Sequence, residues 1–270
     1  MITENLNIIS ENLQNSAQMP VLFIGHGDPR NAILDNPFTK HLSILGKSIE
    51  PRPKAILVIS AHWLTRGTFV CTNPNPETIH DFGGFPEEMY KIQYPAKGSP
   101  DYAEQVKNKS AQINNYFDWG LDHGAWTILK HLFPNADIPV FQLSIDYFKP
   151  MQYHFDLAMQ LKSLRDKGLL IIGSGNIVHN LQMYFNAKDN KPFDWAIEFD
   201  EWTKNKIINK DFKSLINYEK YGRAAELSVP TNDHYVPMIY SLALSDKSES
   251  INFTYEEVLS SMSMRAFKIG

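Results

Sequence analysis

Three stretches of the chain are almost wholly apolar, and a histidine follows each of them within a few positions. They span residues 21–25, 55–59 and 169–173. A run that is apolar on both faces is typical of a central parallel strand buried between helices. The runs lead to His26, His62 and His179. Ligands of open α/β sheets collect at the carboxyl ends of such strands, so the pattern predicts that these histidines converge on one metal site.

Elsewhere in the chain, apolar residues recur at helical spacing or alternate as in strands. The expected helices cover residues 38–48, 101–112, 126–133, 153–167, 194–210 and 238–244. Further strands are expected at residues 68–72 and 139–144, with an edge strand at 262–268. This alternation of strands and helices predicts an α/β fold, in which a mostly parallel central sheet is flanked by helices in a single large domain.

The boundary of that domain is marked by the first residues of the chain. Residues 1–18 are polar and contain no Lys or Arg, which predicts an N-terminal leader outside a domain at residues 19–270. The leader lacks the basic and apolar regions of a signal peptide. No run reaches the ~18 apolar residues that cross a bilayer. We therefore expect a cytoplasmic protein without a membrane partner.

Charge and cysteine content narrow the chemistry. The formal net charge is −4 and no basic run is present, so a nucleic acid is not an expected partner. The single cysteine, Cys71, excludes an internal disulfide framework. A metal site in this chain must therefore use nitrogen and oxygen ligands. The composition leaves the oligomeric state open.

Residues 73–100 are the longest stretch without a regular period, and they are rich in proline and aromatic side chains. Long irregular segments of compact domains tend to be functional, so we expect an ordered loop over a pocket. Phe82 and Phe85 would contact a bound substrate there. For His80, in the same loop, substrate contact and a hydrogen bond that pins the loop are equally compatible with the sequence.

Two more histidines stand near the starts of expected helices. His123 follows Asp122, which is well placed to cap the helix that comes next. His123 therefore belongs either to a site or to the cap. His234 lies in a turn just before the helix at residues 238–244, in a position comparable with that of the strand-end histidines.

Five ordered motifs carry a family resemblance. They are GHGDP around His26, SAHW around His62, IHDFGGFP at residues 79–86, GSGNIVHN at residues 173–180 and DHYVP around His234. Together they resemble the LigB-like class III extradiol ring-cleavage dioxygenases, most closely the DOPA-dioxygenase branch. The resemblance spans residues 19–270. It implies an enzyme that inserts O2 into a small aromatic diol, DOPA or a related catechol, and opens the ring with one non-haem Fe(II) or, in some members, Zn(II).

The resemblance also implies roles for individual residues. His26 and His62 correspond to the paired metal ligands, and His234 takes the position of the third ligand. His179 corresponds to the acid/base residue, with a provisional role as a fourth ligand in the substrate-free state. His123 would hydrogen-bond the substrate or the bound oxygen species.

The third ligand is a departure from part of the family. The protocatechuate-type members use a carboxylate there, as sites with two histidines and one carboxylate do generally. This chain offers His234, with Asp233 and Glu226 as nearby carboxylates. Three neutral imidazoles leave the charge of a divalent ion uncompensated, which favours an anionic catecholate and is equally compatible with zinc.

Two other functions are compatible with the sequence. Three histidines and an open position are also what zinc needs to generate hydroxide, so a zinc-dependent hydrolase is one alternative. The other is a non-enzymatic binding protein, because Memo-type proteins resemble the same fold and act as binding partners. The presence of all four histidines at positions 26, 62, 179 and 234 argues against such a scaffold, which has no use for them.

Overall fold

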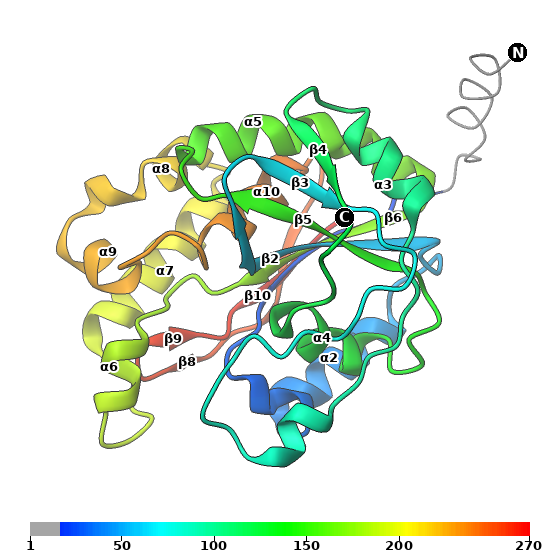
Figure 1. The fold of residues 1–270 in the computed structure, drawn as a ribbon. Helices are drawn as coiled ribbons and strands as arrows, with labels where there is room; N and C mark the ends of the chain where they lie inside the picture. The colour runs from blue at the N-terminus through cyan, green and yellow to red at the C-terminus, as the bar shows by residue number, and fades with distance from the viewer. Residues whose placement is uncertain (1–16) are drawn as a thin grey trace, which may run out of the picture.

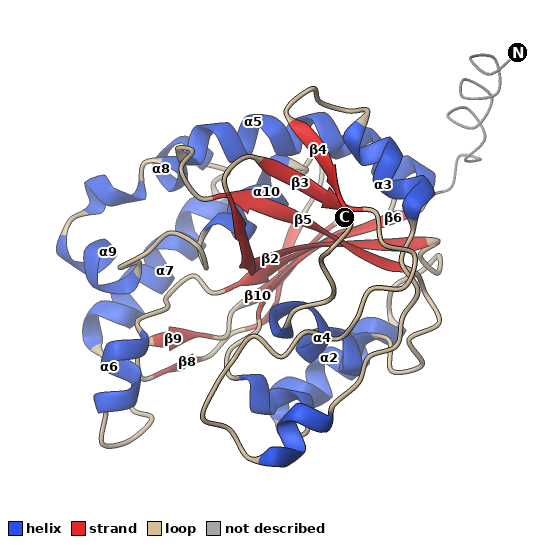
Figure 2. Cartoon of the chain, in the orientation of Figure 1, coloured by secondary structure: helices blue, strands red, loops and turns tan. Residues whose placement is uncertain are grey.

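A computed structural model describes residues 17–270 of the chain. The predicted leader at residues 1–18 lies outside the described residues except for its last two positions. An eight-stranded sheet runs through the centre of the molecule, with helices on both of its faces (Figure 1; Figure 2). This architecture confirms the predicted α/β fold with flanking helices in one domain.

The central sheet is mostly parallel. Its strands are β1 (Val21–Gly25), β2 (Ala55–Thr65), β3 (Thr68–Cys71), β4 (Ile113–Tyr116), β5 (Val140–Asp146), β6 (Leu169–Gly175), β7 (Ile251–Tyr255) and β10 (Ala266–Ile269). Their order is β4-β3-β5-β2-β6-β1-β10-β7. The inner strands β5, β2, β6 and β1 are parallel to one another, and β10 is antiparallel to both of its neighbours. Strands β8 (Val258–Leu259) and β9 (Met262–Ser263) form a separate two-stranded ribbon.

Helices cover both faces of the sheet. They are α2 (Pro37–Lys47), α3 (Pro100–Lys107), α4 (His123–Leu132), α5 (Met151–Leu161), α6 (Leu181–Asn186), α7 (Asp194–Ile208), α8 (Phe212–Ile216), α9 (Arg223–Ser228) and α10 (Val236–Ala243). Short 3-10 helices are η1 (Pro29–Ala32), η2 (Glu87–Lys91), η3 (Lys162–Lys167) and η4 (Tyr218–Tyr221). Helices α3, α5, α7 and α10 pack in one hydrophobic core, whereas α2 and α4 pack in the other.

The inner strands supply side chains to both cores. In β2, Leu57 and Ile59 belong to one core, and Ile56 and Val58 belong to the other. These four side chains are fully buried. The wholly apolar runs of the sequence are thus central strands covered on both faces, as predicted.

The structure corrects the predicted position of His62. The sequence predicts an apolar strand at residues 55–59, with His62 beyond its end. Strand β2 instead continues through His62 to Thr65, and its pairing with β5 shifts register between Ile59 and Leu64. Such an irregularity re-aims a side chain without ending the strand. His62 is therefore presented within an irregular strand and not beyond its end.

The C-terminal segment is also corrected. The predicted edge strand at residues 262–268 is divided: residues 262–263 form β9, and β10 lies inside the sheet between β1 and β7. Strands β4 and β7 are the two edges of the sheet, and the sequence prediction missed both. The alternation of side chains at residues 262–268 had suggested an edge strand with one exposed face. Here Arg265 is 2 % exposed and pairs with the equally buried Asp200.

In the described part of the chain, no helix is long and apolar enough to cross a membrane.

Candidate metal centre

Five histidines meet at one end of the parallel strands. They are His26 after β1, His62 in β2, His123 at the start of α4, His179 after β6 and His234 in the turn before α10. All five line one cavity of about 220 Å³. Their segments are far apart in the sequence, so only the parallel arrangement of the strands brings these imidazoles together.

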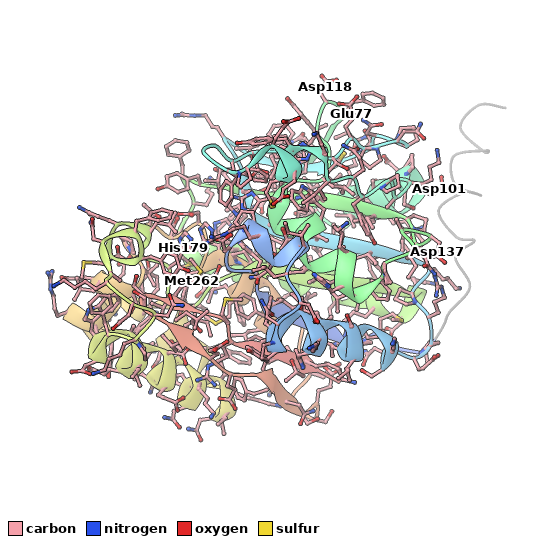
Figure 3. All side chains as sticks on the ribbon, turned by 90° about the horizontal axis from the view of Figure 1, so that it is seen from below. Glu77, Asp101, Asp118, Asp137, His179 and Met262 are labelled. Carbon is pink, nitrogen blue, oxygen red and sulfur yellow. The ribbon has the colours of Figure 1, made fainter. Side chains whose placement is uncertain are left out.

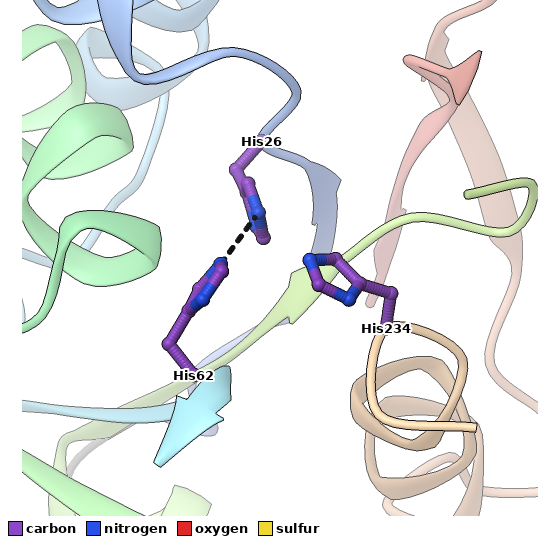
Figure 4. Close-up of side chains that lie close together, drawn as sticks. All are labelled: His26, His62 and His234. Atoms are coloured by element: carbon purple, nitrogen blue, oxygen red, sulfur yellow. Dashed lines mark hydrogen bonds between the residues drawn. The ribbon is translucent and has the colours of Figure 1, made fainter. Parts of the chain in front are cut away.

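His26, His62 and His234 form a cluster of possible metal ligands (Figure 4). Each can offer one ring nitrogen such that all three nitrogens lie within 4.8 Å of one another. The Nε2 atoms of His26 and His62 are 3.1 Å apart. Nitrogens bound at ~2.0–2.1 Å to one ion are roughly 2.9 to 3.4 Å apart, from a right angle to a tetrahedral angle. The observed separation therefore suits two ligands of a single ion.

Hydrogen bonds fix the tautomer of His26. Its Nδ1 lies 3.0 Å from the hydroxyl of Ser174, and that hydroxyl donates its own hydrogen to the main-chain oxygen of Gly124 at 2.6 Å. Ser174 must therefore accept from Nδ1–H of His26. The lone pair of His26 is left on Nε2, which faces the cluster.

His234 is oriented in the same sense by a carboxylate. Its Nδ1–H donates to Asp233, the residue before it. Its Nε2 is buried and has no hydrogen-bond partner among the described residues. A buried unpaired imidazole nitrogen is costly unless something else binds it. This orphaned nitrogen, aimed at His26 and His62, fits a divalent metal ion (Figure 4).

The electrostatics keep the rings of His26 and His62 neutral. Burial, and then the neighbouring histidine rings, holds the pKa of His26 well below its usual value. The pKa of His62 is lowered in the same way, first by burial and then by His123. Metal ions bind the deprotonated imidazole, so a lowered pKa favours the ligand form.

Asp81, in the long loop, organises the far side of the cluster. Its carboxylate accepts from the main-chain N–H of His123 at 2.8 Å and from the ring Nδ1–H of His123 at 2.9 Å. It also lies 3.5 Å from Nδ1 of His62. Burial opposes ionisation of Asp81, but the hydrogen bonds from His123 lower its pKa below the usual value. Asp81 therefore carries negative charge directly beside two of the histidines.

A second carboxylate, Asp122, holds the start of α4. It accepts from the main-chain N–H of Ala125, which confirms the predicted helix cap, and from Ser60 and Gln142 at 2.6 and 2.7 Å. Complete burial, and then the charge of Asp81, raises the pKa of Asp122 to about 6. The sequence left His123 either to the helix cap or to the site, and the structure joins the two roles. The cap by Asp122 places the ring of His123 against the ring of His62, with centroids 3.8 Å apart.

Gly124 allows this close approach. A Cβ atom at Gly124 would lie 2.5 Å from Oγ of Ser60 and 2.8 Å from Cδ2 of His62. Any side chain there would push α4 away from β2. The glycine is therefore required by the packing of the site and not by its backbone torsion.

His179 lies on the ring of His234. The two rings are stacked, with centroids 3.4 Å apart and planes 9° from parallel. The main chain of His179 bridges to Met262, and the two side chains are neighbours in Figure 3. Burial, and then His234, holds the pKa of His179 well below its usual value. His179 is thus a neutral imidazole at the wall of the cavity.

Apolar side chains close the remaining wall of the cavity. They are Phe82 and Phe85 from the long loop, Leu181 and Phe185 from α6, and Met262. His80 is not in this lining. Its Nε2–H donates to the main-chain oxygen of Ile92 at 3.0 Å, which ties the loop to itself. Substrate contact by His80 remains a prediction.

The sequence prediction missed several residues of the site. It did not give Asp81 a role of its own, and it assigned no role to Leu181, Tyr184 and Phe185 of α6 or to Met262, which line the cavity. The IHDFGGFP motif was the only signal for Asp81. Nothing in the pattern of the sequence distinguishes Tyr184.

Comparison with known proteins agrees with the fold and the histidine cluster. Residues 18–264 match the family described as the catalytic LigB subunit of aromatic ring-opening dioxygenase. The chain belongs to this family of extradiol ring-opening dioxygenases, which are oxidoreductases.

Several relatives are similar over nearly the full length of the chain. A 4,5-DOPA dioxygenase extradiol from Escherichia coli K12 is 42% identical over 97% of this chain and 99% of its own length. One from Beta vulgaris is 36% identical over 87% of this chain and 91% of its own. The crystal structure of an uncharacterized Escherichia coli K12 protein has a TM-score of 0.81 at 39% identity, covering 94% of this chain and 100% of that one.

Proposed function

We propose that this protein opens the ring of DOPA or a related catechol with O2, using a ferrous ion held by His26, His62 and His234. The observation that carries the proposal is the set of three imidazoles with converging nitrogens, one of which, Nε2 of His234, is buried without a partner among the described residues. The relatives named as 4,5-DOPA dioxygenases support DOPA as the substrate. When bound, a non-haem ferrous ion supplies the Lewis acidity and redox chemistry of ring opening.

Two carboxylates outside the ligand set compensate the charge. Asp233 accepts from His234, and Asp81 lies 3.5 Å from the Nδ1 atom of His62. Carboxylates in this position orient a ligating histidine and raise its basicity. The negative charge that a carboxylate ligand would supply is thus supplied by Asp233 and Asp81, which lie behind the histidine ligands.

His179 and His123 flank the space where a catechol would sit. His179 is held neutral by burial and by His234, so its imidazole can accept a phenolic proton from the substrate and return it later. Nδ1–H of His123 is used by Asp81, which leaves Nε2 to hydrogen-bond an oxygen of the substrate. We assign proton transfer to His179 and orientation of the substrate to His123.

The aromatic wall holds the ring and excludes water. Phe82 and Phe85 pack against each other with centroids 5.0 Å apart, and the ring of Phe82 lies 5.6 Å from that of His123. A planar substrate ring lying against these side chains would bury an apolar face while its two hydroxyls point toward the histidines. We assign Phe82 and Phe85 to substrate binding, with His80 supporting their loop.

The test is anaerobic loading of the protein with Fe(II), followed by oxygen and a panel of catechols that includes DOPA. We expect one O2 consumed per catechol and a coloured ring-opened product. A His26→Ala, His62→Ala double variant should bind no iron and consume no oxygen. An iron-loaded protein that consumes no O2 with any catechol would refute the proposal.

The same set of three neutral imidazoles supports a second candidate, a zinc-dependent hydrolase. Zinc would use the open position for hydroxide and would need no O2. Zinc-loaded protein should therefore be tested with ester and amide substrates under argon. Hydrolysis by the zinc form, together with no oxygen uptake by the iron form, would favour this function.

A further inference from the structure

The histidine cavity adjoins a second cavity that the proposed reaction does not use. The second cavity has a volume of about 320 Å³, compared with about 220 Å³ for the first. Both are lined by Asp28, Tyr184 and Met262. Asp28 and Met262 come from opposite ends of the sequence, so the tertiary fold builds the boundary that the two cavities share.

The first cavity is large enough for the ring of the substrate. A cavity of ~150 Å³ holds a benzene ring, and the histidine cavity measures about 220 Å³. A ring substituent on the side of Asp28, Tyr184 and Met262 would reach the residues that the first cavity shares with the second.

Arg30 is the one Lys or Arg among the described residues that line the two cavities. Asp28 binds one edge of the guanidinium group of Arg30 through two hydrogen bonds: Oδ1 accepts from Nε at 2.9 Å and Oδ2 accepts from Nη2 at 2.6 Å. The main-chain N–H of Arg30 also donates to Asp28, at 2.8 Å. These bonds hold the side chain in place although it is 53 % exposed.

The opposite edge of the guanidinium is available. Within residues 17–270, the side-chain hydrogen bonds of Arg30 use Nε and Nη2 and leave Nη1 without an acceptor. A planar guanidinium binds a carboxylate through two parallel N–H groups, and the Nη1/Nη2 edge presents such a pair. Burial raises the pKa of half-buried Tyr184, Asp28 raises it further and Arg30 opposes the rise, so Tyr184 lies close to this ion pair.

We propose that Arg30 binds the carboxylate of a side chain carried by the catechol, and so selects amino-acid or other acidic catechols. This inference rests on the proposed ring-opening function and names the substrate class of that site. Glu257 lines the same cavity, so an amino group beside the carboxylate would face an acidic side chain. Asp28 acts as the positioning residue that keeps the free edge of Arg30 turned to the cavity.

Four catechols separate the parts of this recognition. DOPA carries a carboxylate and an amino group, 3-(3,4-dihydroxyphenyl)propionate carries only the carboxylate, dopamine carries only the amino group, and 4-methylcatechol carries neither. Steady-state oxygen uptake by the iron-loaded protein gives kcat and KM for each. Anaerobic calorimetric titration of the same iron-loaded protein gives the binding constants independently of turnover.

The Arg30→Met variant should raise KM and Kd for the two carboxylates by about 10- to 100-fold, the value of a charge-assisted hydrogen bond. Its kcat/KM for dopamine and 4-methylcatechol should stay within about twofold of the unaltered protein. Arg30→Lys should recover part of the loss, because it keeps the charge without the planar fork. Lys40→Met is the matched control, because it removes a cation from an exposed position of α2, where Lys40 pairs with Asp35. Lys40 lines neither cavity.

Two results would overturn the inference while leaving ring opening intact. One is an unchanged KM for DOPA in Arg30→Met, and the other is an equal loss for all four catechols. If the unaltered protein opens none of them, the proposed function itself fails, and the inference falls with it. Thermal melts of each variant test for a general loss of folding. Removal of an exposed ion pair of this kind should not cause one.

Discussion

The ring of His179 lies flat against the ring of His234, with centroids 3.4 Å apart and planes within 9° of parallel. An imidazole binds a metal through a lone pair in the plane of its ring. Because the two planes are stacked, the in-plane lone pairs of the two rings lie in separate, nearly parallel planes and do not converge. The arrangement therefore favours His179 as a proton carrier beside the ion over its provisional role as a fourth ligand.

The first prediction concerns this residue. His179→Ala should keep full iron content and lower kcat by about 10²- to 10⁴-fold, the usual contribution of a general acid or base. Iron is measured by elemental analysis and kcat by oxygen uptake. His131→Gln, outside the cavity, is the control and should retain both. Loss of iron in His179→Ala would instead make His179 a ligand.

The second prediction concerns the carboxylate behind His234. Asp233→Asn should weaken metal binding by about 10- to 100-fold, because the ligand loses the partner that orients its ring and raises its basicity. Equilibrium dialysis against Fe(II) under argon measures the change. Asp137→Asn, which removes a surface ion pair with Arg52, should bind iron normally. Equal affinities of the two variants would exclude a role for Asp233 at the metal.

The third prediction concerns Asp81. Asp81→Asn should reduce kcat by about 10- to 100-fold, since an amide cannot accept both N–H groups of His123 as strongly and the ring loses its fixed tautomer. Iron content should fall less than in Asp233→Asn, because Asp81 is 3.5 Å from Nδ1 of His62 and within hydrogen-bond distance only of His123. An unchanged kcat at full iron loading would contradict the assignment.

The fourth prediction concerns pH and stability away from the site. Burial lowers the pKa of His154 to about 4, against a partial opposing effect of Asp146. In the unfolded chain His154 would titrate near 6.5, so the unfolded state binds a proton first as the pH falls. The folded protein should therefore lose stability between about pH 6.5 and 4, by about 3 kcal/mol at the lower limit.

Chemical denaturation at several pH values measures this effect. His154→Gln should lose some stability at pH 7, because the hydrogen bond with Tyr240 is altered, but should show a flatter dependence on pH below 6.5. If the unaltered protein and the variant lose stability in parallel, other groups are responsible.

The sequence predicted most of the inner sheet because that information is local. Strand β6 is buried at every position and begins with four consecutive apolar residues, a run typical of a strand covered on both faces. The prediction of the helix cap at Asp122 also rested on neighbouring residues, since an acidic residue before an apolar helical stretch can accept from the free N–H groups of the first turn. The family motifs marked the histidines at positions 26, 62, 179 and 234 as candidate site residues before any geometry was available.

The position of β10 and the role of Asp81 were not predictable in this way. The alternation of side chains at residues 262–268 suggested an edge strand, whereas Arg265, beside β10, is buried and pairs with Asp200 more than sixty residues away. Asp81 acquires its role only when the loop folds back onto α4, where it meets both N–H groups of His123. Neither pairing leaves a periodic signal in the chain.

By itself, therefore, the sequence determined which strands are buried and which histidines follow them, because hydrophobic periodicity is a property of neighbouring residues. The tertiary structure decided how the imidazoles share one cavity, which carboxylates stand behind them, and that Arg30 faces the adjoining cavity. Those features depend on distances between segments far apart in the chain, and such distances exist only once the sheet has brought the segments together.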